Sequence, residues 1–499
     1  AVRQVVNETG ETVRLPKELR PVEEDLRSIQ RTLGGRETEA REAEQRRQDL
    51  VAFLAHDLKT PLTSVLGYLN LLHDEPGLTA EQRAKYTGIA LDKAKRLEEL
   101  ISEFFDITRM DFRTLGGNGE PIQLSILLEQ LAEEAYQKDR FVFEGVIWLL
   151  LFGTLPTSAE LKEFGQILDS HRALPDGFAE DMIMKAPSPN IMNKLARGVL
   201  AMYSYDENPE DLSLENLLEQ SISLIAGLPT IMVNAWQIKR RIYDHQSMFF
   251  HMPIPGQSTA EHILATYRAD QKFTHEEAKL LDLCLMLHAD HGGGNNSAFT
   301  CRVLSSSGTD TYSAIAAAIG SLKGPKHGGA NLKVMEQLEH IRAGVENHTD
   351  EDEVREFLRK IIRRQEGDGS GLIYGMGHAV YTLSDPRAII LRQHAKDLAF
   401  EKGFEDEFNL LCLVEKLGPQ VFAEEKGNKT VCANVDLYSG LIYKMLGIEP
   451  DLYTPLFAIS RIPGWCAHRI EEVMFANRII RPAYKYLGVR QKYKTLEER

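Results

Sequence analysis

The pattern of hydrophobic and polar positions divides the first third of the chain into two parts. Residues 1–48 are mostly polar, with one heptad-like series of apolar positions followed by charged and small residues from 36 to 49. That composition is typical of a solvated helical stalk or linker. From Asp49 the pattern becomes strongly amphipathic, with a turn at 74–79 between two long helical stretches. Residues 49–137 therefore predict a helical hairpin, and two hairpins would pair as a dimeric four-helix bundle.

The rest of the chain shows one helical pattern after another. Residues 141–157 contain an apolar run too short to span a membrane, which we interpret as a buried helix. Three further helical patterns occupy 158–285, and the alternation typical of strands is scarce. The predicted fold class is therefore mainly α. No run of about 18 apolar residues occurs, so no membrane span is expected in this chain.

Composition narrows the range of functions. The chain has 499 residues, 43% of them hydrophobic, which is enough for several domains with a sizeable core. Its net charge of -15 and pI near 5.6 argue against a nucleic-acid partner. The five cysteines form no C-x-x-C pair, which indicates a reducing compartment. With no signal peptide expected either, we predict a cytoplasmic protein.

Four short runs between His288 and Gly440 combine reactive side chains with glycine. They are HADHGGGNNS (288–297), GPKHGGAN (324–331), YGMGHAVYTLSDPR (374–387) and CANVDLYSG (432–440). Glycine has no Cβ, so backbone and ligand can approach each other closely beside a histidine. One such run would be weak evidence, but four in succession predict a binding or catalytic site.

In this order, the four runs resemble the citrate synthase family over about residues 139–488. The resemblance implies that 138–499 form the all-α fold of that family, without its usual N-terminal segment. It implies an acyltransferase that condenses acetyl-CoA with oxaloacetate to give citrate and CoA. Acetyl-CoA would be a co-substrate, no cofactor would be tightly bound, and the protein would be a homodimer. The motifs fit a 2-methylcitrate synthase acting on propionyl-CoA equally well.

The resemblance implies three catalytic residues. Asp436 matches the base that removes the methyl proton, although an aspartate before a helix is also a favoured N-cap. His327 matches the group that stabilises the enol, and a following helix N-terminus would keep its imidazole neutral. Taken alone, His327 could equally be a histidine packed in a glycine turn. His378 matches the proton donor to the ketone oxygen.

Four further residues match the oxaloacetate contacts of the family. Arg387, Arg461 and Arg481 would bind carboxylates, for which the guanidinium fork is well suited. His291 matches the remaining contact. The alternative is that His288 and His291 share a helix face and bind a metal. No third ligand with suitable spacing is evident, so no metal is expected.

The coenzyme A contacts rest on a looser match. Gly375, Gly377 and Asn434 occupy places where the pantetheine arm approaches the backbone in that family. Lys323 and Lys326 are candidates to meet the phosphates, although lysines in a loop are more often simply solvated. The arginine matching Arg481 reaches into the partner subunit's site in the family, which implies a site shared by two chains.

A separate resemblance covers the N-terminal part. The run FLAHDLKTPLTSVLGYL (53–69) resembles the phosphoacceptor helix of sensor histidine kinases, and residues 1–137 resemble the vancomycin-resistance type. It implies that His56 takes the phosphoryl group, assisted by Asp57 and Thr60, with a response regulator as possible partner. The third functional alternative is thus a signalling module fused to an inactive enzyme.

The kinase-like part lacks the nucleotide-binding motifs of such kinases. Neither an asparagine box nor a D-x-G-x-G box is found, and GDGSG (367–371) has the wrong spacing and is predicted to be a turn. Histidine kinase activity is therefore not expected. The sequence leaves open whether the junction is a natural fusion, an engineered chimera or an artefact of joining.

Overall fold

The computed structural model describes residues 87–89, 140–377, 385–427, 431–476, 478–481 and 495. The chain divides into two compact units, residues 1–122 and 123–499, and nearly all described residues belong to the second. Apart from a helical stretch at 87–89, the predicted stalk and helical hairpin lie outside the described residues, and so does His56.

The second unit is a succession of helices. They are α4 (Phe143–Phe152), α5 (Ser158–His171), the π-helix η3 (Ala179–Met184), α6 (Ile191–Met202), the 3₁₀ turn η4 (Tyr203–Tyr205), α7 (Leu214–Ile242), α8 (Thr259–Tyr267), α9 (His275–His288), α10 (Asn296–Ser305), α11 (Thr311–Leu322), α12 (Ala330–Gly344), α13 (Glu351–Ile362), α14 (Pro386–Glu401), α15 (Glu405–Lys426), α16 (Asp436–Met445), the 3₁₀ turn η5 (Pro450–Leu452) and α17 (Tyr453–Phe475). Within the described part of this unit there is no strand, only an isolated bridge between Met376 and Ala433. The predicted mainly α class is confirmed.

Several helices begin where the sequence carries a capping signal. Thr157, Ser258 and Thr274 each accept a hydrogen bond from the backbone of a glutamate three residues on, whose side chain bonds back to the cap. Asp385 caps α14 by accepting a hydrogen bond from the backbone N–H of Arg387, and Pro386 follows as the first residue of the helix, where a missing N–H costs nothing. That cap sets the position of the first turn of α14.

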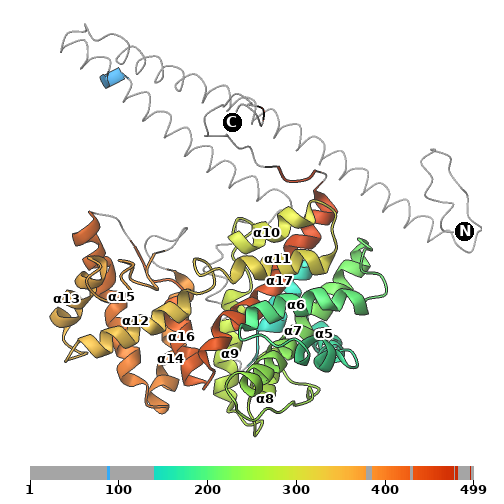
Figure 1. Cartoon of the computed structure of the whole chain (residues 1–499), viewed down its shortest axis with the longest axis horizontal. Coiled ribbons are helices and arrows are strands. Elements are labelled where there is room, and N and C mark those ends of the chain that lie inside the picture. The colour runs from blue at the N-terminus through green and yellow to red at the C-terminus, as the bar shows by residue number, and fades with distance from the viewer. Residues whose placement is uncertain are drawn as a thin grey trace, which may run out of the picture. The chain divides into compact units, whose positions relative to one another are not determined.

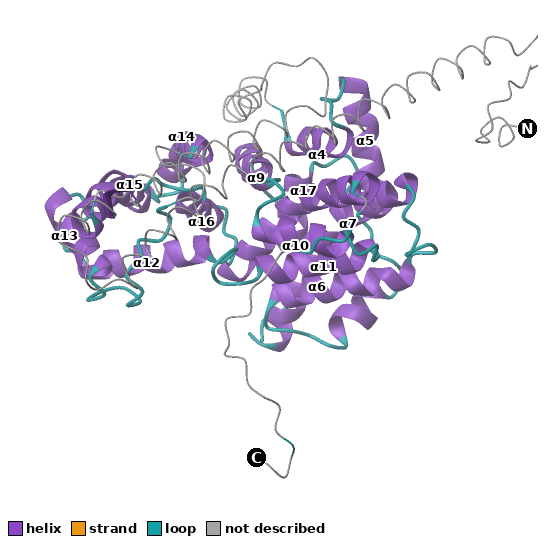
Figure 2. Ribbon diagram, turned by 90° about the horizontal axis from the view of Figure 1, so that it is seen from above, coloured by secondary structure: helices purple, strands orange, loops and turns teal. Residues whose placement is uncertain are grey.

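The helices form two groups, which Figures 1 and 2 show from two directions. Helices α12 to α16 make up one group, and the remaining helices make up the other. The groups meet along α9 and α17: α9 packs against α14 and α16, and α17 packs against α9 and α12. The loops and helix ends at this junction carry the sequence motifs.

α7 is the central helix of the larger group. By length and composition this helix could cross a membrane, whereas the sequence predicted no such segment. Most of its apolar stretch is buried against α5, α6, α8 and α17, as expected for the core helix of a globular domain. α4 confirms the predicted buried helix, because Phe143 and Ile147 lie in the same core.

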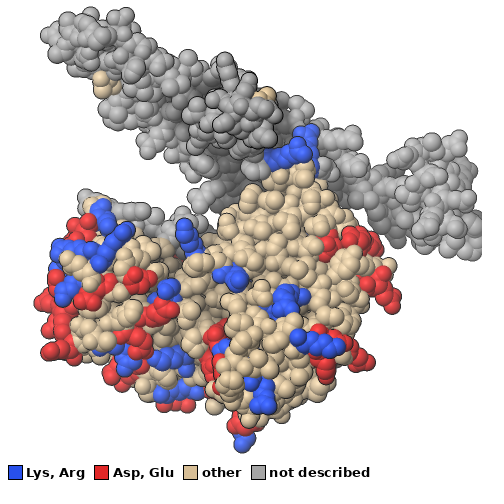
Figure 3. All heavy atoms as spheres, in the orientation of Figure 1, with Lys and Arg blue, Asp and Glu red and all other residues tan. Residues whose placement is uncertain are grey.

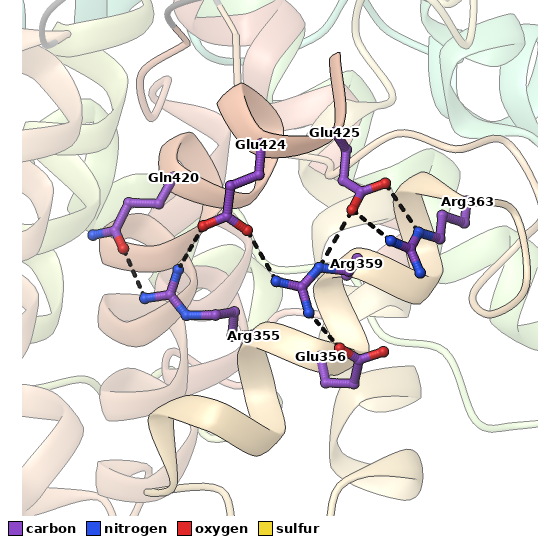
Figure 4. A network of polar contacts seen from close by, with 7 residues as sticks. All are labelled: Arg355, Glu356, Arg359, Arg363, Gln420, Glu424 and Glu425. Atoms are coloured by element: carbon purple, nitrogen blue, oxygen red, sulfur yellow. Dashed lines mark hydrogen bonds and ion pairs between the residues drawn. The ribbon is translucent and has the colours of Figure 1, made fainter. Parts of the chain in front are cut away.

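A ladder of ion pairs joins α13 to α15 on the solvent side (Figure 4). Arg355 and Arg359 both contact Glu424, at 3.4 and 2.9 Å. Arg359 also lies 3.3 Å from Glu425, which accepts two hydrogen bonds from Arg363, at 2.9 and 2.8 Å. A single exposed ion pair stabilises a protein by only about 0.2–1 kcal/mol. The alternation of arginine and glutamate side chains along the ladder therefore contributes more to stability than any one pair.

Candidate active site

The loop after α9 carries the first motif. His288 is the last residue of α9, and its Nδ1 lies 2.8 Å from the carbonyl oxygen of Cys284. His291 lies three residues beyond the end of the helix, so the two histidines do not share a helix face. The alternative of a metal pair therefore loses its geometric basis. In the described ranges, no group of three or more His, Cys, Asp or Glu side chains is arranged to hold a metal ion.

His327 lies in the turn between α11 and α12. Its Nε2 is 3.0 Å from Ser297 Oγ, which also accepts a hydrogen bond of 3.2 Å from Trp465 Nε1. The serine also donates to Oδ1 of Asn295 at 2.9 Å, so its one O–H is shared between two acceptors. The contact with Nε2 therefore fixes the orientation of the ring and leaves its tautomer open. Gly328 permits the turn, since a Cβ there would lie 2.4 Å from the carbonyl oxygen of Leu322.

The imidazole of His327 is neutral at ordinary pH, as the sequence predicted. Burial lowers its pKa to about 4, and the positive charge of Arg461 acts in the same direction. Burial and a nearby arginine thus lower this pKa, and the contribution expected from the N-terminus of α12, which begins at Ala330, stays a prediction. A neutral imidazole keeps one N–H, which can donate a hydrogen bond to a developing oxyanion.

Asp436 is the first residue of α16, not its N-cap. The cap position is Val435, and no side-chain cap hydrogen bond is made there, so the alternative role of Asp436 as a helix cap is ruled out. Its Oδ1 is buried and has no hydrogen-bond partner among the residues that the structure describes. Burial raises the pKa of Asp436 to about 6, and it does so against the lowering effect of Arg387 and Arg461. A carboxylate of raised basicity with an unoccupied oxygen suits proton abstraction.

Two short segments hold the start of α16 in place. The backbone N–H of Gly377 donates to the carbonyl of Cys432 at 2.7 Å, and that of Asn434 donates to Gly375 at 2.9 Å. The side chain of Asn434 also donates to the carbonyl of Gly377, at 3.0 Å. Gly375 has φ +80°, and a Cβ there would lie 2.7 Å from the side chain of Leu437. These contacts tie the loop after α13 to the first turn of α16.

Two buried arginines lie near Asp436. Arg387 donates from Nε and Nη2 to the two oxygens of Asp385, at 3.0 and 2.8 Å, which fixes its guanidinium in the first turn of α14. Arg461, in the middle of α17, donates from Nε to the carbonyl of His288 at 2.5 Å. Within the described ranges its Nη1 is buried without a partner, and burial lowers the pKa of Arg461 to about 10. That orphaned donor can meet an anionic ligand.

The structure thus brings four predicted residues into one electrostatic environment: Asp436 interacts with Arg387 and Arg461, and His327 interacts with Arg461. The other predicted residues are less closely placed. His291 is half-buried, and Arg481 is exposed in the single chain. His378 lies outside the described residues.

The predicted coenzyme A residues divide into two sets. Gly375, Gly377 and Asn434 cluster through the hydrogen bonds given above, beside the start of α16. Lys323 and Lys326 are exposed in the turn before His327. Their exposure agrees with either phosphate contact or simple solvation.

Sequence reasoning missed the residues that support this site. Ser297 ends the first motif and was not singled out, although it is the polar residue nearest to His327. The ion pair of Asp290 with His468 was also missed. The sequence did contain one indication of the role of His468, because it follows Arg461 by seven positions and so lies on the same helix face.

Two family models match the chain. "Citrate synthase, C-terminal domain" matches residues 112–483, and "His Kinase A (phospho-acceptor) domain" matches residues 46–113. Together they confirm both resemblances and their order along the chain. The predicted boundary near residue 137 is not tested by them.

Similar proteins include the citrate synthase of Deinococcus radiodurans, 34% identical over 81% of this chain and 99% of that protein. The 2-methylcitrate synthase of Shewanella oneidensis is 31% identical over 72% of this chain and 87% of its own length. Among solved structures, the citrate synthase of Thermoplasma acidophilum, in a ternary complex with carboxymethyl coenzyme A and oxaloacetate, has a TM-score of 0.63 at 28% identity, covering 74% of this chain and 91% of that one. The predicted loss of an N-terminal segment stays a prediction. With a family model spanning most of its length and relatives above 30% identity, this chain belongs to the citrate synthase family.

Proposed function

We propose that this protein condenses acetyl-CoA with oxaloacetate and hydrolyses the resulting thioester to citrate and CoA. The observation that carries the proposal is the buried Oδ1 of Asp436, which has no partner in the described part of the chain; burial raises the pKa of this carboxyl to about 6 against the charges of Arg387 and Arg461. Such an oxygen is a suitable acceptor for a proton from carbon. The relatives named as citrate synthases support the same reaction.

The first chemical step is enolisation. The carboxylate of Asp436 takes a proton from the methyl carbon of acetyl-CoA, and the electron pair of that C–H bond moves toward the thioester oxygen. In this proposal the proton of neutral His327 is on Nδ1, from which it donates to that oxygen and stabilises its developing charge. Ser297 orients the ring through its contact with Nε2.

The second step forms the carbon–carbon bond. The enol carbon attacks the ketone of oxaloacetate, and the proton donor to the new alkoxide is His378. Water then hydrolyses the citryl thioester, releasing citrate and the thiol of CoA. The guanidinium groups of Arg387 and Arg461 bind the carboxylates, the latter through the orphaned Nη1.

The arginine set is completed, in this proposal, by Arg481 of a second copy. The face over α10, α11 and α6 is poor in charged side chains (Figure 3). On α11 the less buried positions are small, at Ser313, Ala317 and Gly320, and on α10 Phe299 is 39% exposed. Small residues at helical spacing allow close helix packing, so this face supports a homodimer.

Propionyl-CoA is the alternative acyl donor, and the 2-methylcitrate synthase relative supports it. Release of the CoA thiol with oxaloacetate and either acyl-CoA, monitored by a thiol reagent, tests both possibilities. A higher kcat/KM for acetyl-CoA supports the first proposal, and the reverse order supports 2-methylcitrate synthase. No release with either donor would instead support a signalling module fused to an inactive enzyme.

For the N-terminal module we propose a phosphoacceptor role at His56. The match of the phosphoacceptor family over residues 46–113 supports it. A kinase domain on another chain would supply the phosphoryl group, and a response regulator would receive it. Acid-labile labelling of the wild type but not of His56→Gln, in the presence of such a kinase and labelled ATP, tests this role.

A further inference from the structure

Three residues on one face of α17 contact consecutive parts of the loop that carries His291. Arg461, Gly464 and His468 are spaced three and four residues apart, which places them in line along a helix. Arg461 contacts the last residue of α9, where the loop begins, since its Nε donates to the carbonyl of His288 at 2.5 Å. The other two contact the following positions.

Gly464 lets the loop lie directly on the helix. A Cβ at this position would lie 2.5 Å from the carbonyl oxygen of Ala289 and 2.8 Å from Oδ1 of Asp290. No side chain could be accommodated at those distances without moving the backbone. The loop and the middle of α17 are therefore in contact at main-chain distance.

His468 contacts the loop one turn further along. Its Nε2 lies 3.1 Å from Oδ1 of Asp290, and the second carboxylate oxygen accepts a 2.9 Å hydrogen bond from the backbone N–H of Gly292. The side chains of His468 and Asp290 are only 15% and 27% exposed. Asp290 thus links α17 to the backbone on the far side of His291.

The charges of this pair are stabilised by each other. Burial would raise the pKa of Asp290, but its hydrogen bond and attraction to His468 outweigh this and lower it to about 2. Burial would likewise lower the pKa of His468, but bonding to Asp290 and to Glu471 raises it to about 9. The imidazolium and carboxylate are therefore both present around neutral pH.

We propose that His468 is a positioning residue for oxaloacetate binding, which acts through Asp290 to fix the segment 290–292 and with it His291. The inference rests on the proposed function only in that His291 contacts oxaloacetate. The segment is held before His291 by the Asp290 carboxylate and after it by the N–H of Gly292. Without the contact to His468, the Asp290 carboxylate would lose its hydrogen bond to the helix that also carries Arg461.

The test measures oxaloacetate affinity without acyl-CoA, by titration calorimetry, on His468→Ala, His468→Gln and Asp290→Asn. Misplacing a binding group by about 1 Å can cost about 100-fold, so we expect His468→Ala to weaken oxaloacetate binding by about 10- to 100-fold. His468→Gln retains an N–H donor toward Asp290 and should recover most of this loss. In turnover, the KM for oxaloacetate should rise more than kcat falls.

Glu277→Gln is the matched control. Glu277 lies on α9, the helix that precedes the loop, and is buried in an ion pair with Arg268 at 2.7 Å. This variant should lower the melting temperature and leave oxaloacetate affinity unchanged. If His468→Ala behaves in the same way, its role is structural and the proposal is overturned.

The failure of the proposed function can be told apart from the failure of this inference. A wild type that binds oxaloacetate but releases no thiol, with affinity still dependent on His468, rejects the condensation and supports the positioning role. An active wild type whose affinity is unaffected in all three variants rejects the positioning role alone. A wild type that binds no oxaloacetate rejects both.

Discussion

The hydroxyl of Ser297 lies 3.0 Å from Nε2 of His327. The two residues are 30 positions apart and belong to different motifs. Through this contact, and the bond that Ser297 accepts from Trp465, the orientation of the His327 ring is fixed from its Nε2 side.

Ser297→Ala should therefore impair catalysis by His327. Losing an orienting hydrogen bond to a catalytic group should lower kcat by about 10- to 100-fold, with little change in oxaloacetate affinity. Steady-state thiol-release kinetics would measure both parameters. Ser307→Ala serves as control, because Ser307 is exposed and bonds only to the carbonyl of Leu304. An unchanged kcat in Ser297→Ala would contradict the orienting role.

Asp436→Asn should bind oxaloacetate normally and lose turnover. An amide cannot accept the methyl proton, so we expect kcat to fall by about 10²- to 10⁴-fold. The control is Asp350→Asn, which changes an aspartate that caps α13 away from the site. A near-normal kcat for Asp436→Asn would reject the base assignment, even if Asp350→Asn were fully active.

Asp436 should also make the activity of the wild type fall at acidic pH. The pKa of Asp436 is raised by burial to about 6, so the basic form is present above that pH and is lost as the pH falls through it. His327, with a pKa near 4, stays neutral across this range. Because this pKa belongs to the ligand-free enzyme, we expect kcat/KM for acetyl-CoA to fall tenfold per pH unit well below about pH 6. A profile flat down to about pH 5 would contradict the shift.

The ion pair of Asp290 and His468 should stabilise the fold within a defined pH window. The raised pKa of His468 gives a contribution that is complete below its ordinary 6.5 and is lost as the pH rises through about 9. The lowered pKa of Asp290 gives a contribution present above 3.8 and lost toward about 2. The difference in melting temperature between wild type and His468→Gln should thus be largest near about pH 5 and shrink above about pH 9. A difference independent of pH would count against the charged pair.

Mixed dimers can test whether each site uses Arg481 of the other chain. Asp436→Ala and Arg481→Ala should each be inactive as homodimers. Refolding them together gives mixed dimers in which one site carries both changes and the other neither, so activity should return to roughly a quarter of wild type. No recovery, with subunit exchange verified by mass spectrometry of tagged chains, would assign Arg481 to its own subunit.

Autophosphorylation of His56 is not expected. The sequence holds the phosphoacceptor motif but none of the glycine boxes that bind ATP in such kinases. Incubating the purified protein with labelled ATP should leave no acid-labile label. Labelling in the wild type that is absent from His56→Gln would contradict this prediction.

Much of the architecture follows from the sequence alone, because its signals are local. The capping boxes at Thr157, Ser258 and Thr274 mark where helices begin, and helical periodicity without strand alternation decides the mainly α class. The order of the four motifs also identified the family. Each of these signals depends on neighbours within a few residues, so no tertiary contact was needed to detect them.

The tertiary structure decided how the motif residues act. It placed His291 beyond the end of α9 and Asp436 inside α16, where it does not serve as a cap. Trp465 meets Ser297 across 168 residues, and His468 meets Asp290 across 178. Which partner a buried polar group finds, and hence its pKa and tautomer, depends on how distant helices pack. Periodicity within one segment carries no information about that packing, so only the assembled fold could reveal these pairs.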